Sequence, residues 1–538
     1  MKKVAIYDTT LRDGAQGEGI HFSLPAKIRL ARNLDAFGVD YIEGGFAASN
    51  PADRAFFEEI RKEPLTHAKV AVFGSTRRAR HTAQEDPGLA AILATEAPVA
   101  TIFGKSWLLH VEKVLKTTPE ENLGMIADSV RFLKANGKEV IYDAEHFFDG
   151  YKDNPGYALD TLRAAMEAGA DWLCLCDTNG GGLPSEVFEI TAAVREQFSS
   201  VRLGIHTHND SELAVATSLS AVEAGATLVQ GTLNGYGERT GNANLCSIIP
   251  CLALKMGISL TCGKRMKNLK SLSLLADELT DQHPLKSRPF VGESAFAHKA
   301  GMHVDAVSKV STSFEHVDPS LVGNERRVLI SELSGSSNVR LLTDKMGIPL
   351  QKDAPEVKDI LCKLENLEKS GYQFESADAS VKLLIQKTLK KHTPFFELEG
   401  FSVVVQKRDA ASKATTVATI KVNVNGQTEL TAGEGDGPVD ALNNALRKVL
   451  LHSYPAIKDV VLEDYHVRIL NPETATKATT RVLIDSSDRH ARWGTVGVSE
   501  NIIEASWEAL VDSLEYKLLL DEQRKRPDAH AGADSSAN

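Results

Sequence analysis

The first half of the chain alternates short apolar runs with longer amphipathic segments, a pattern that predicts parallel strands joined by helices. Segments of helix length, such as Glu120–Ala135 and Pro184–Phe198, separate most of the apolar runs. Several of these segments end on glycine, as at Gly38 and Gly169, and glycine readily takes the left-handed conformation that ends a helix. The predicted strands are Val4–Tyr7, Tyr41–Phe46, Lys69–Phe73, Val99–Phe103, Glu139–Asp143, Trp172–Cys176, Val201–Ile205 and Thr227–Gly231.

Eight strand–helix units of this kind predict a closed (β/α)8 TIM barrel over residues 1–256. An open doubly wound sheet is the alternative, and it is less favoured because no GxGxxG pattern follows the first strand. In a (β/α)8 barrel the functional residues lie at the carboxyl ends of the strands. Polar clusters follow most of the predicted strands, so we expect the site at that end of the barrel.

The remainder of the chain lacks this repeat. Residues 257–392 predict a mainly helical linker subdomain. Residues 393–523 alternate strands with two amphipathic helices, Val439–Leu451 and Ile502–Leu520, and predict a separate α+β domain. Its predicted strands are Phe401–Gln406, Thr416–Val424, Val461–Ile469, Arg481–Asp485 and Gly494–Val498. Residues 524–538 are charged, then small and polar, which is typical of a disordered tail.

Composition narrows the class of protein. The net charge of −11 argues against a nucleic-acid-binding face, which would be basic. No apolar run approaches the roughly 18 residues that a membrane span needs. Six cysteines without a CxxC pair, and no signal peptide, favour reduced thiols and a cytoplasmic location.

Two histidines, His206 and His208, follow the seventh predicted strand and are separated by one residue. Because side chains alternate faces along a strand, both point the same way and form half of a metal site. The alternative is two ordinary histidines near a strand end. Asp13 is the best carboxylate ligand and Asn242 a candidate amide ligand, although a turn cap and an Asx-turn are their alternatives. Mg²⁺, Mn²⁺, Zn²⁺ and Co²⁺ all suit such a set.

Three more polar residues at the same end of the barrel are candidates for chemistry. Arg12 is placed to stabilise an oxyanion, unless it forms a salt bridge to Glu43. Glu145 is a candidate base, or a partner of a ligand histidine. Thr178 is a candidate for binding a substrate carboxylate, or it stabilises the turn before the helix at Pro184.

Two further features favour structural roles. Cys174 and Cys176 share a strand face, but their apolar strand places them in the core. The run Gly433–Pro438 precedes a helix and could bind an anion. It matches no phosphate-loop pattern, so a turn and a helix start explain it better.

Taken together, several motifs resemble a known family, the acyl-CoA-condensing DRE-TIM metallolyases: the 2-isopropylmalate, homocitrate and citramalate synthases. Within this family the likeness is greatest to the long citramalate synthases, through four further runs. The motifs of the family are Asp8–Gln16, His206–Asp210, Gly235–Asn242, Phe290–His298, Gly301–His303 and Gly435–Ala441. The four further runs are Tyr41–Pro51, Asp143–Tyr151, Cys176–Gly181 and Val322–Val328.

The resemblance implies a reaction in which acetyl-CoA, pyruvate and water give (R)-citramalate and CoA, in isoleucine biosynthesis. A sibling synthase that takes a bulkier 2-oxo acid, such as 2-isopropylmalate synthase, is the alternative. Phe46, Phe103 and Tyr142 at strand ends could close a small pocket around pyruvate. The resemblance further implies that residues 393–523 form a regulatory domain, with isoleucine as effector, in a homodimer.

The resemblance also implies roles for single residues. Asp13, His206 and His208 would bind the divalent metal, with Asn242 in or close to its shell. Arg12 would polarise the pyruvate carbonyl, and Thr178 would hold the carboxylate. The candidates for enolising acetyl-CoA, Glu145 and His303, rank equally, because no clear tyrosine follows Gly323 to assist the histidine. A lyase on the same barrel and a non-catalytic amino-acid sensor are the rival classes.

Overall fold

The computed structural model describes residues 3–46, 50–329, 335–351, 353–471 and 478–525. The chain divides into two compact units, which are described separately below. One consists of Met1–Phe296 with Glu315–Arg326, and the other of Ala297–Phe314 with Arg327–Asn538.

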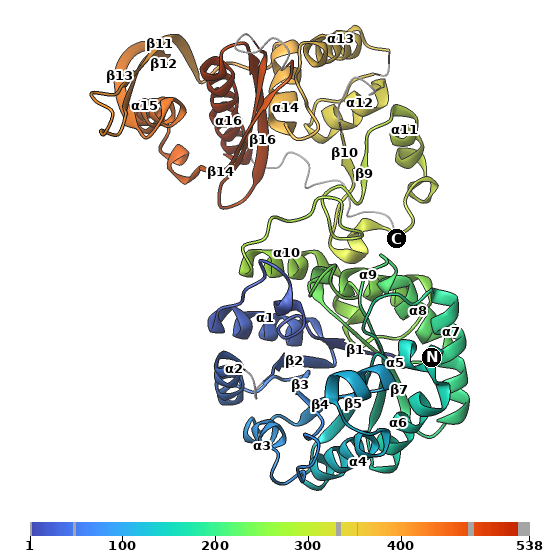
Figure 1. Ribbon diagram of the computed structural model, residues 1–538. Coiled ribbons are helices and arrows are strands. Elements are labelled where there is room, and N and C mark those ends of the chain that lie inside the picture. The colour runs from blue at the N-terminus through green and yellow to red at the C-terminus, as the bar shows by residue number, and fades with distance from the viewer. Residues whose placement is uncertain (1–2, 47–49, 330–334, 352, 472–477, 526–538) are drawn as a thin grey trace. The chain divides into compact units, whose positions relative to one another are not determined.

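The first unit is a closed barrel of eight parallel strands, as predicted (Figure 1). The first strand pairs with the second on one side and with the eighth on the other, which closes the sheet. Several strands extend one or two residues beyond their apolar runs, so that polar side chains lie on their carboxyl ends. The strands are β1 Ala5–Asp8, β2 Tyr41–Gly45, β3 Lys69–Ser75, β4 Val99–Lys105, β5 Glu139–Glu145, β6 Trp172–Asp177, β7 Arg202–Thr207 and β8 Leu228–Gly231.

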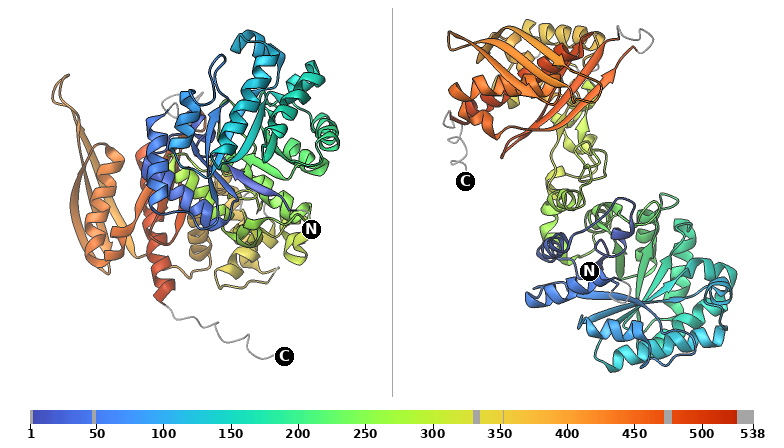
Figure 2. Two further views of the ribbon diagram at one scale, coloured as in Figure 1. Left: turned by 90° about the horizontal axis from the view of Figure 1, so that it is seen from below. Right: turned by 60° about the vertical axis from the view of Figure 1, so that its left-hand side comes forward.

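Helices surround the strands, and Figure 2 shows this ring from two further sides. Local sequence fixes many of their ends: the Ser23 side chain caps α1, and Gly38 ends that helix with a φ of 97°. The main apolar core lies between strands and helices, and a smaller one fills the barrel interior. The helices are α1 Leu24–Phe37, α2 Pro51–Lys62, α3 Pro87–Ala94, α4 Pro119–Ala135, α5 Phe147–Asp153, α6 Pro155–Glu167, α7 Pro184–Gln197, α8 Ala214–Ala224, α9 Leu245–Pro250 and α10 Leu269–Leu279.

In its described residues, the second unit has four α-helices followed by two similar halves, each a three-stranded antiparallel sheet followed by a helix. This confirms the predicted C-terminal α+β region. The helices are α11 Gly301–Lys309, α12 Ser336–Lys345, α13 Pro355–Lys369 and α14 Asp378–Thr388, and the short strands β9 Ala297–His298 and β10 Arg327–Val328 pair nearby. The halves are β11 Phe396–Gln406, β12 Thr415–Val424, β13 Gln427–Gly435 and α15 Pro438–Ser453, then β14 Val461–Ile469, β15 Thr480–Ser487, β16 Arg492–Ser499 and α16 Ile502–Lys525.

Strand β13 was not among the predicted elements. It carries few apolar residues, so its sequence lacks the usual signal of a strand. Its glycines at the end of the strand lie against α15: a Cβ at Gly433 would lie 2.4 Å from the Ala445 nitrogen. The run Gly433–Pro438 therefore ends a strand and begins a helix, in line with the structural alternative.

The compact units do not coincide with the predicted domain ranges. Helices α13 and α14 share an apolar core with β16, through Ile360, Val381 and Val496. Of the predicted tail, Arg524 and Lys525 still belong to α16, and residues 526–538 lie outside the described part of the chain.

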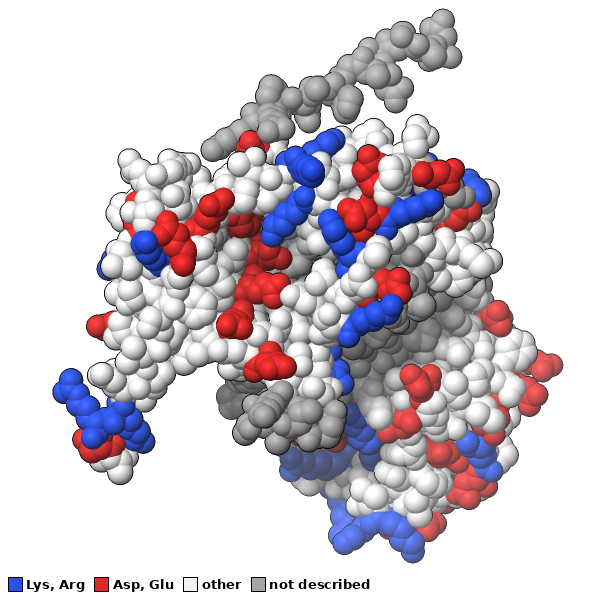
Figure 3. Space-filling model, turned by 90° about the horizontal axis from the view of Figure 1, so that it is seen from above, with Lys and Arg blue, Asp and Glu red and all other residues white. Residues whose placement is uncertain are grey.

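On the face drawn in Figure 3, acidic and basic side chains lie among uncharged ones. Among the described helices, none is long and apolar enough to span a membrane.

Candidate metal centre

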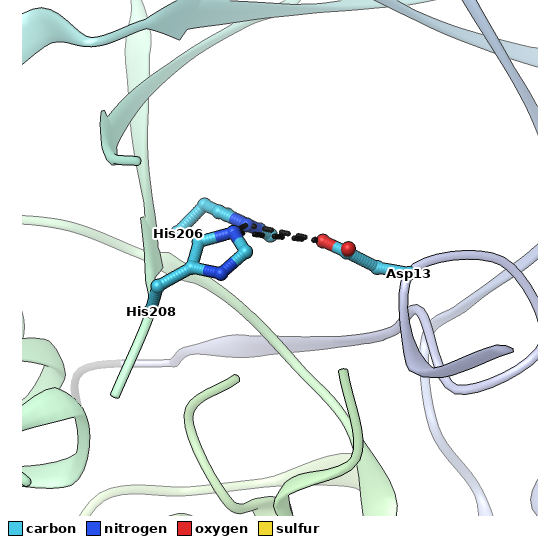
Figure 4. Close-up of side chains that lie close together, drawn as sticks. All are labelled: Asp13, His206 and His208. Carbon is cyan, nitrogen blue, oxygen red and sulfur yellow. Dashed lines mark hydrogen bonds and ion pairs between the residues drawn. The ribbon is translucent and has the colours of Figure 1, made fainter. Parts of the chain in front are cut away.

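Asp13, His206 and His208 come together at the carboxyl end of the barrel, with their side chains pointing toward one another (Figure 4). His206 lies in β7 and His208 just beyond it, while Asp13 lies in the turn after β1. The Asp13 Oδ2 atom is 3.3 Å from His206 Nε2 and 3.9 Å from His208 Nε2. All three residues are buried. The structure thus brings together three of the four residues that the sequence predicts as metal ligands, and the fourth, Asn242, lies nearby.

The geometry of this cluster fits a divalent ion. The two Nε2 atoms lie 3.1 Å apart. Neighbouring ligands about 2.1 Å from one ion are roughly 3 Å apart, so both nitrogens could bind the same metal. Near them, Asn242 forms an isolated bridge with His208, and its Nδ2 donates to the Tyr236 carbonyl. The Asn242 Oδ1 atom is buried without a hydrogen-bond partner among the described residues, which suits a ligand or near-ligand of the ion.

The charges of the three residues depend on one another. Burial raises the pKa of Asp13, but Arg12 and the two histidines more than offset this and hold it well below its usual range. Burial and the neighbouring His206 lower the pKa of His208 to about 3. Burial lowers the pKa of His206, yet Asp13 reverses the shift and raises it. Asp13 is therefore a carboxylate and His208 a neutral imidazole, which are the forms that bind metals.

Arg12 lies beside the cluster and is held on two sides. Its Nε donates to Glu43 at 2.5 Å, and its guanidinium lies 3.6 Å from the centre of the Phe73 ring. Its Nη1 is 3.5 Å from Asp13. Glu43 is fully buried and also accepts from Tyr7. The predicted salt bridge to Glu43 is thus present, and it orients Arg12 toward the metal cluster rather than away from it.

A cavity of about 510 Å³ opens over these residues. Phe46, Phe73 and Phe103 form an aromatic wall of this cavity, with Phe73 and Phe103 stacked at 5.4 Å. Tyr142 does not belong to the wall, contrary to expectation. Since Asp143 points into the barrel, strand alternation turns Tyr142 outward into the main core. The predicted site residues in the lining are Arg12, Asp13, Glu145, Thr178, His206 and His208.

Glu145 and His303, the candidates for proton transfer, and Thr178, the candidate for carboxylate binding, lie in different environments. Glu145 forms an ion pair with Lys105 at the end of β4. The Thr178 hydroxyl accepts from the His146 backbone at 2.8 Å, which leaves its own proton free to donate. His303 is exposed on α11 in the other compact unit, where it stacks on Phe314. Its catalytic role stays a prediction.

Several residues of the site carry no role in the sequence-based prediction. Arg239 pairs with Asp210 and donates to the Thr178 carbonyl, so it links the loops after β6, β7 and β8. Gln230 contacts both His206 and Asp143. The sequence does hold a signal for a role of Gln230, because this residue is the lone polar one in the apolar run of β8. Burial raises the pKa of Asp143 to about 7.

Cys174 and Cys176 are buried inside the barrel, as the core interpretation predicts. Together with Asp143 they form a second group with metal-binding spacing. Burial raises the pKa of both thiols, that of Cys176 to about 11. The thiol forms are therefore favoured over the thiolates that metals bind.

Three family descriptions match consecutive parts of the chain. Residues 3–272 match the HMGL-like family, which covers the barrel. Residues 290–371 match the homocitrate synthase post-HMGL domain-like family. Residues 375–518 match the LeuA allosteric (dimerisation) domain.

Similar proteins match over nearly the whole chain. The chain is 52% identical to the (R)-citramalate synthase of Aquifex aeolicus over 522 residues, which cover 97% of this chain and 99% of the relative. It is also 52% identical to the (R)-citramalate synthase of Geobacter sulfurreducens, with the same coverage. A probable 2-isopropylmalate synthase of Methanopyrus kandleri is 30% identical over 510 residues, covering 95% of this chain and 97% of the relative.

Proposed function

The chain belongs to the family of metal-dependent barrel enzymes that includes the (R)-citramalate and 2-isopropylmalate synthases, and we propose that it condenses acetyl-CoA with pyruvate to give (R)-citramalate and CoA. The observation that carries this proposal is the cavity in which Asp13, His206 and His208 lie beside Arg12. Full-length identity of 52% to (R)-citramalate synthases supports the choice of substrates. The reaction consumes one water, since the thioester of the condensation product is hydrolysed.

Asp13, His206 and His208 would hold the divalent ion, with Asn242 beside them. When bound, this ion supplies Lewis-acid chemistry that polarises a 2-oxo acid. The family relationship supports a metal requirement, and the donor set suits Mg²⁺, Mn²⁺, Zn²⁺ or Co²⁺.

The protein's own groups account for the remaining steps. The Arg12 guanidinium donates to the carbonyl oxygen of pyruvate and stabilises the alkoxide that forms there. The Thr178 hydroxyl, which accepts from the His146 backbone, donates a hydrogen bond to the pyruvate carboxylate. Either Glu145 or His303 takes a proton from the acetyl methyl group of acetyl-CoA, and the resulting carbon nucleophile attacks the carbonyl carbon.

The aromatic wall of the cavity supports pyruvate, rather than a larger 2-oxo acid, as the substrate. Phe46 packs edge-on against Phe73, which stacks on Phe103, so the wall is filled by rings rather than by small side chains. The test is to incubate the enzyme with acetyl-CoA and a panel of 2-oxo acids while following release of the CoA thiol. We expect the highest kcat/KM with pyruvate. A clearly higher value with 2-oxoisovalerate would favour a 2-isopropylmalate synthase instead.

The C-terminal region supports a regulatory role, because residues 375–518 match the LeuA allosteric (dimerisation) domain. We propose that the enzyme is a homodimer of the cytoplasm and that isoleucine, the end product of the pathway, inhibits it through residues 393–523. The six free cysteines fit a reducing compartment. Titration of the full-length enzyme with isoleucine, with valine and leucine as controls, tests the effector. Unchanged rates at saturating isoleucine would exclude it.

A further inference from the structure

Gln230 is fully buried on β8, and its amide group lies between a metal-ligand candidate and a buried acid. His206 and Gln230 are register partners on the neighbouring strands β7 and β8. The Gln230 Oε1 atom lies 3.0 Å from His206 Nδ1, and its Nε2 donates to Asp143 Oδ1 at 2.9 Å. Three inward-facing side chains from β5, β7 and β8 thus form one chain of hydrogen bonds.

The chemistry of each member fixes the direction of this chain. The Gln230 NH₂ group contacts Asp143 Oδ1, and an amide NH₂ only donates, so this oxygen of Asp143 accepts. The amide oxygen then faces His206, and it too only accepts. His206 must therefore carry a proton on Nδ1, so in the neutral imidazole the lone pair lies on Nε2, the atom that faces Asp13 and His208.

His208 offers an internal contrast. Its Nδ1 is buried without a hydrogen-bond partner among the described residues. Among the described residues, only His206 of the two histidines has a hydrogen-bond partner on Nδ1, Gln230, that selects its tautomer. Partners of this kind orient metal-binding histidines, and their loss costs roughly 10- to 100-fold in metal affinity.

We propose that Gln230, oriented by Asp143, is a positioning residue that holds His206 in the tautomer and ring orientation needed to bind the metal. This inference rests on the metal site of the proposed function. It predicts that the direction of the hydrogen bonds matters, and not merely the volume that the two side chains fill.

The test measures Co²⁺ binding to metal-free protein by calorimetry, together with the visible spectrum of the bound cobalt. The first variant, Gln230→Met, keeps the length of the side chain but removes the acceptor. We expect its Co²⁺ affinity to fall roughly 10- to 100-fold. In Gln230→Glu, two carboxylates would face each other, and affinity should also fall.

The decisive variant is the double exchange Gln230→Glu with Asp143→Asn. Here the amide introduced on β5 would donate to the carboxylate introduced on β8, whose other oxygen would accept from His206 Nδ1, so the direction is rebuilt with the net charge conserved. We expect this variant to recover most of the affinity and the cobalt spectrum of the wild type. Gln386→Met, at a buried glutamine in the other unit, is the matched control and should bind Co²⁺ normally.

Two results would overturn the inference: wild-type Co²⁺ affinity in Gln230→Met, or a double variant that binds no better than Gln230→Glu. The second comparison remains decisive if circular dichroism finds Gln230→Met unfolded. Failure of the metal site on which the proposed function rests is distinguishable, because the wild type would then bind no divalent metal.

Discussion

At the scale of single residues, the candidate site consists of three metal-ligand candidates and the side chains that hold them in place. Strand alternation alone places His206 and His208 on one face, and the barrel brings the turn with Asp13 to the same end. The partners that hold these groups could not be predicted in the same way. Gln230 meets His206 only because β8 pairs with β7 in a particular register. The stacking of Arg12 on Phe73 likewise depends on a contact between two segments far apart in the sequence, the turn after β1 and strand β3.

Arg12 provides the first prediction at this scale. Replacing it with Lys keeps the positive charge but removes the planar guanidinium that is held by Glu43 and Phe73. We expect kcat to fall by about 100- to 1000-fold, as when one donor to a developing oxyanion is lost. Steady-state kinetics with pyruvate and acetyl-CoA measure the effect.

The matched control is Arg29→Lys, which alters an exposed ion pair with Glu278 and should leave kcat unchanged. Metal affinity should persist in Arg12→Lys, because the three ligand candidates remain. A kcat close to that of the wild type would remove Arg12 from the chemistry.

At the scale of elements, periodicity predicts all eight barrel strands and helices such as α4, α7 and α15. Periodicity does not predict β13, because this edge strand carries few apolar residues. Its pairing with β12 and the close approach of α15 specify the strand instead. Helix ends, in contrast, are encoded locally, by caps such as Ser23 and by glycines such as Gly38.

One link between elements leads to a prediction about pH. Asp35, on α1, accepts hydrogen bonds from Thr66, His67 and Ala68, in the segment before β3. Burial raises the pKa of Asp35, but these hydrogen bonds more than offset it and lower the pKa. The stabilisation is therefore complete above the unfolded-state pKa of about 3.9, and it is lost as the pH falls through the lower, folded-state pKa.

Replacing Asp35 with Asn leaves too few acceptor sites for these donors. We expect the free energy of unfolding to fall by about 1–3 kcal/mol at pH 7. The difference from the wild type should shrink as the pH is lowered through the acidic range. Urea unfolding of both proteins at pH 7 and at a series of acidic pH values measures this. An equal difference at every pH would show that the carboxylate charge is not involved.

At the scale of the whole molecule, the sequence predicts a barrel and a separate C-terminal region. It does not predict the apolar core that helices α13 and α14 share with strand β16. Residues 257–392 predict a helical linker, because the apolar faces of the helices in this range carry no sign of what they contact. In the structure α13 and α14 pack with β16 in one core. Ser380 and Asp378 on α14 also accept hydrogen bonds from the backbone of that strand.

This shared core predicts the result of a truncation. A chain that ends at residue 392 would leave the apolar faces of α13 and α14 without β16. We expect the truncated protein to bind a hydrophobic dye and to unfold at a lower temperature than the full chain. If it instead remained monodisperse with an unchanged Tm, the helices would be stable without the C-terminal sheets.

The central claim is that the barrel condenses pyruvate with acetyl-CoA in a metal-dependent reaction. The most direct measurement supplies ¹³C-labelled pyruvate and acetyl-CoA to the full-length enzyme and identifies the product by NMR and chiral chromatography. Parallel samples contain metal-free enzyme and the same enzyme after a divalent metal is restored. We predict labelled (R)-citramalate in equal amount to the CoA released, none of it without metal, and recovery on metal addition. Turnover that is unaffected by metal removal, or the absence of citramalate in the metal-loaded sample, would contradict the account.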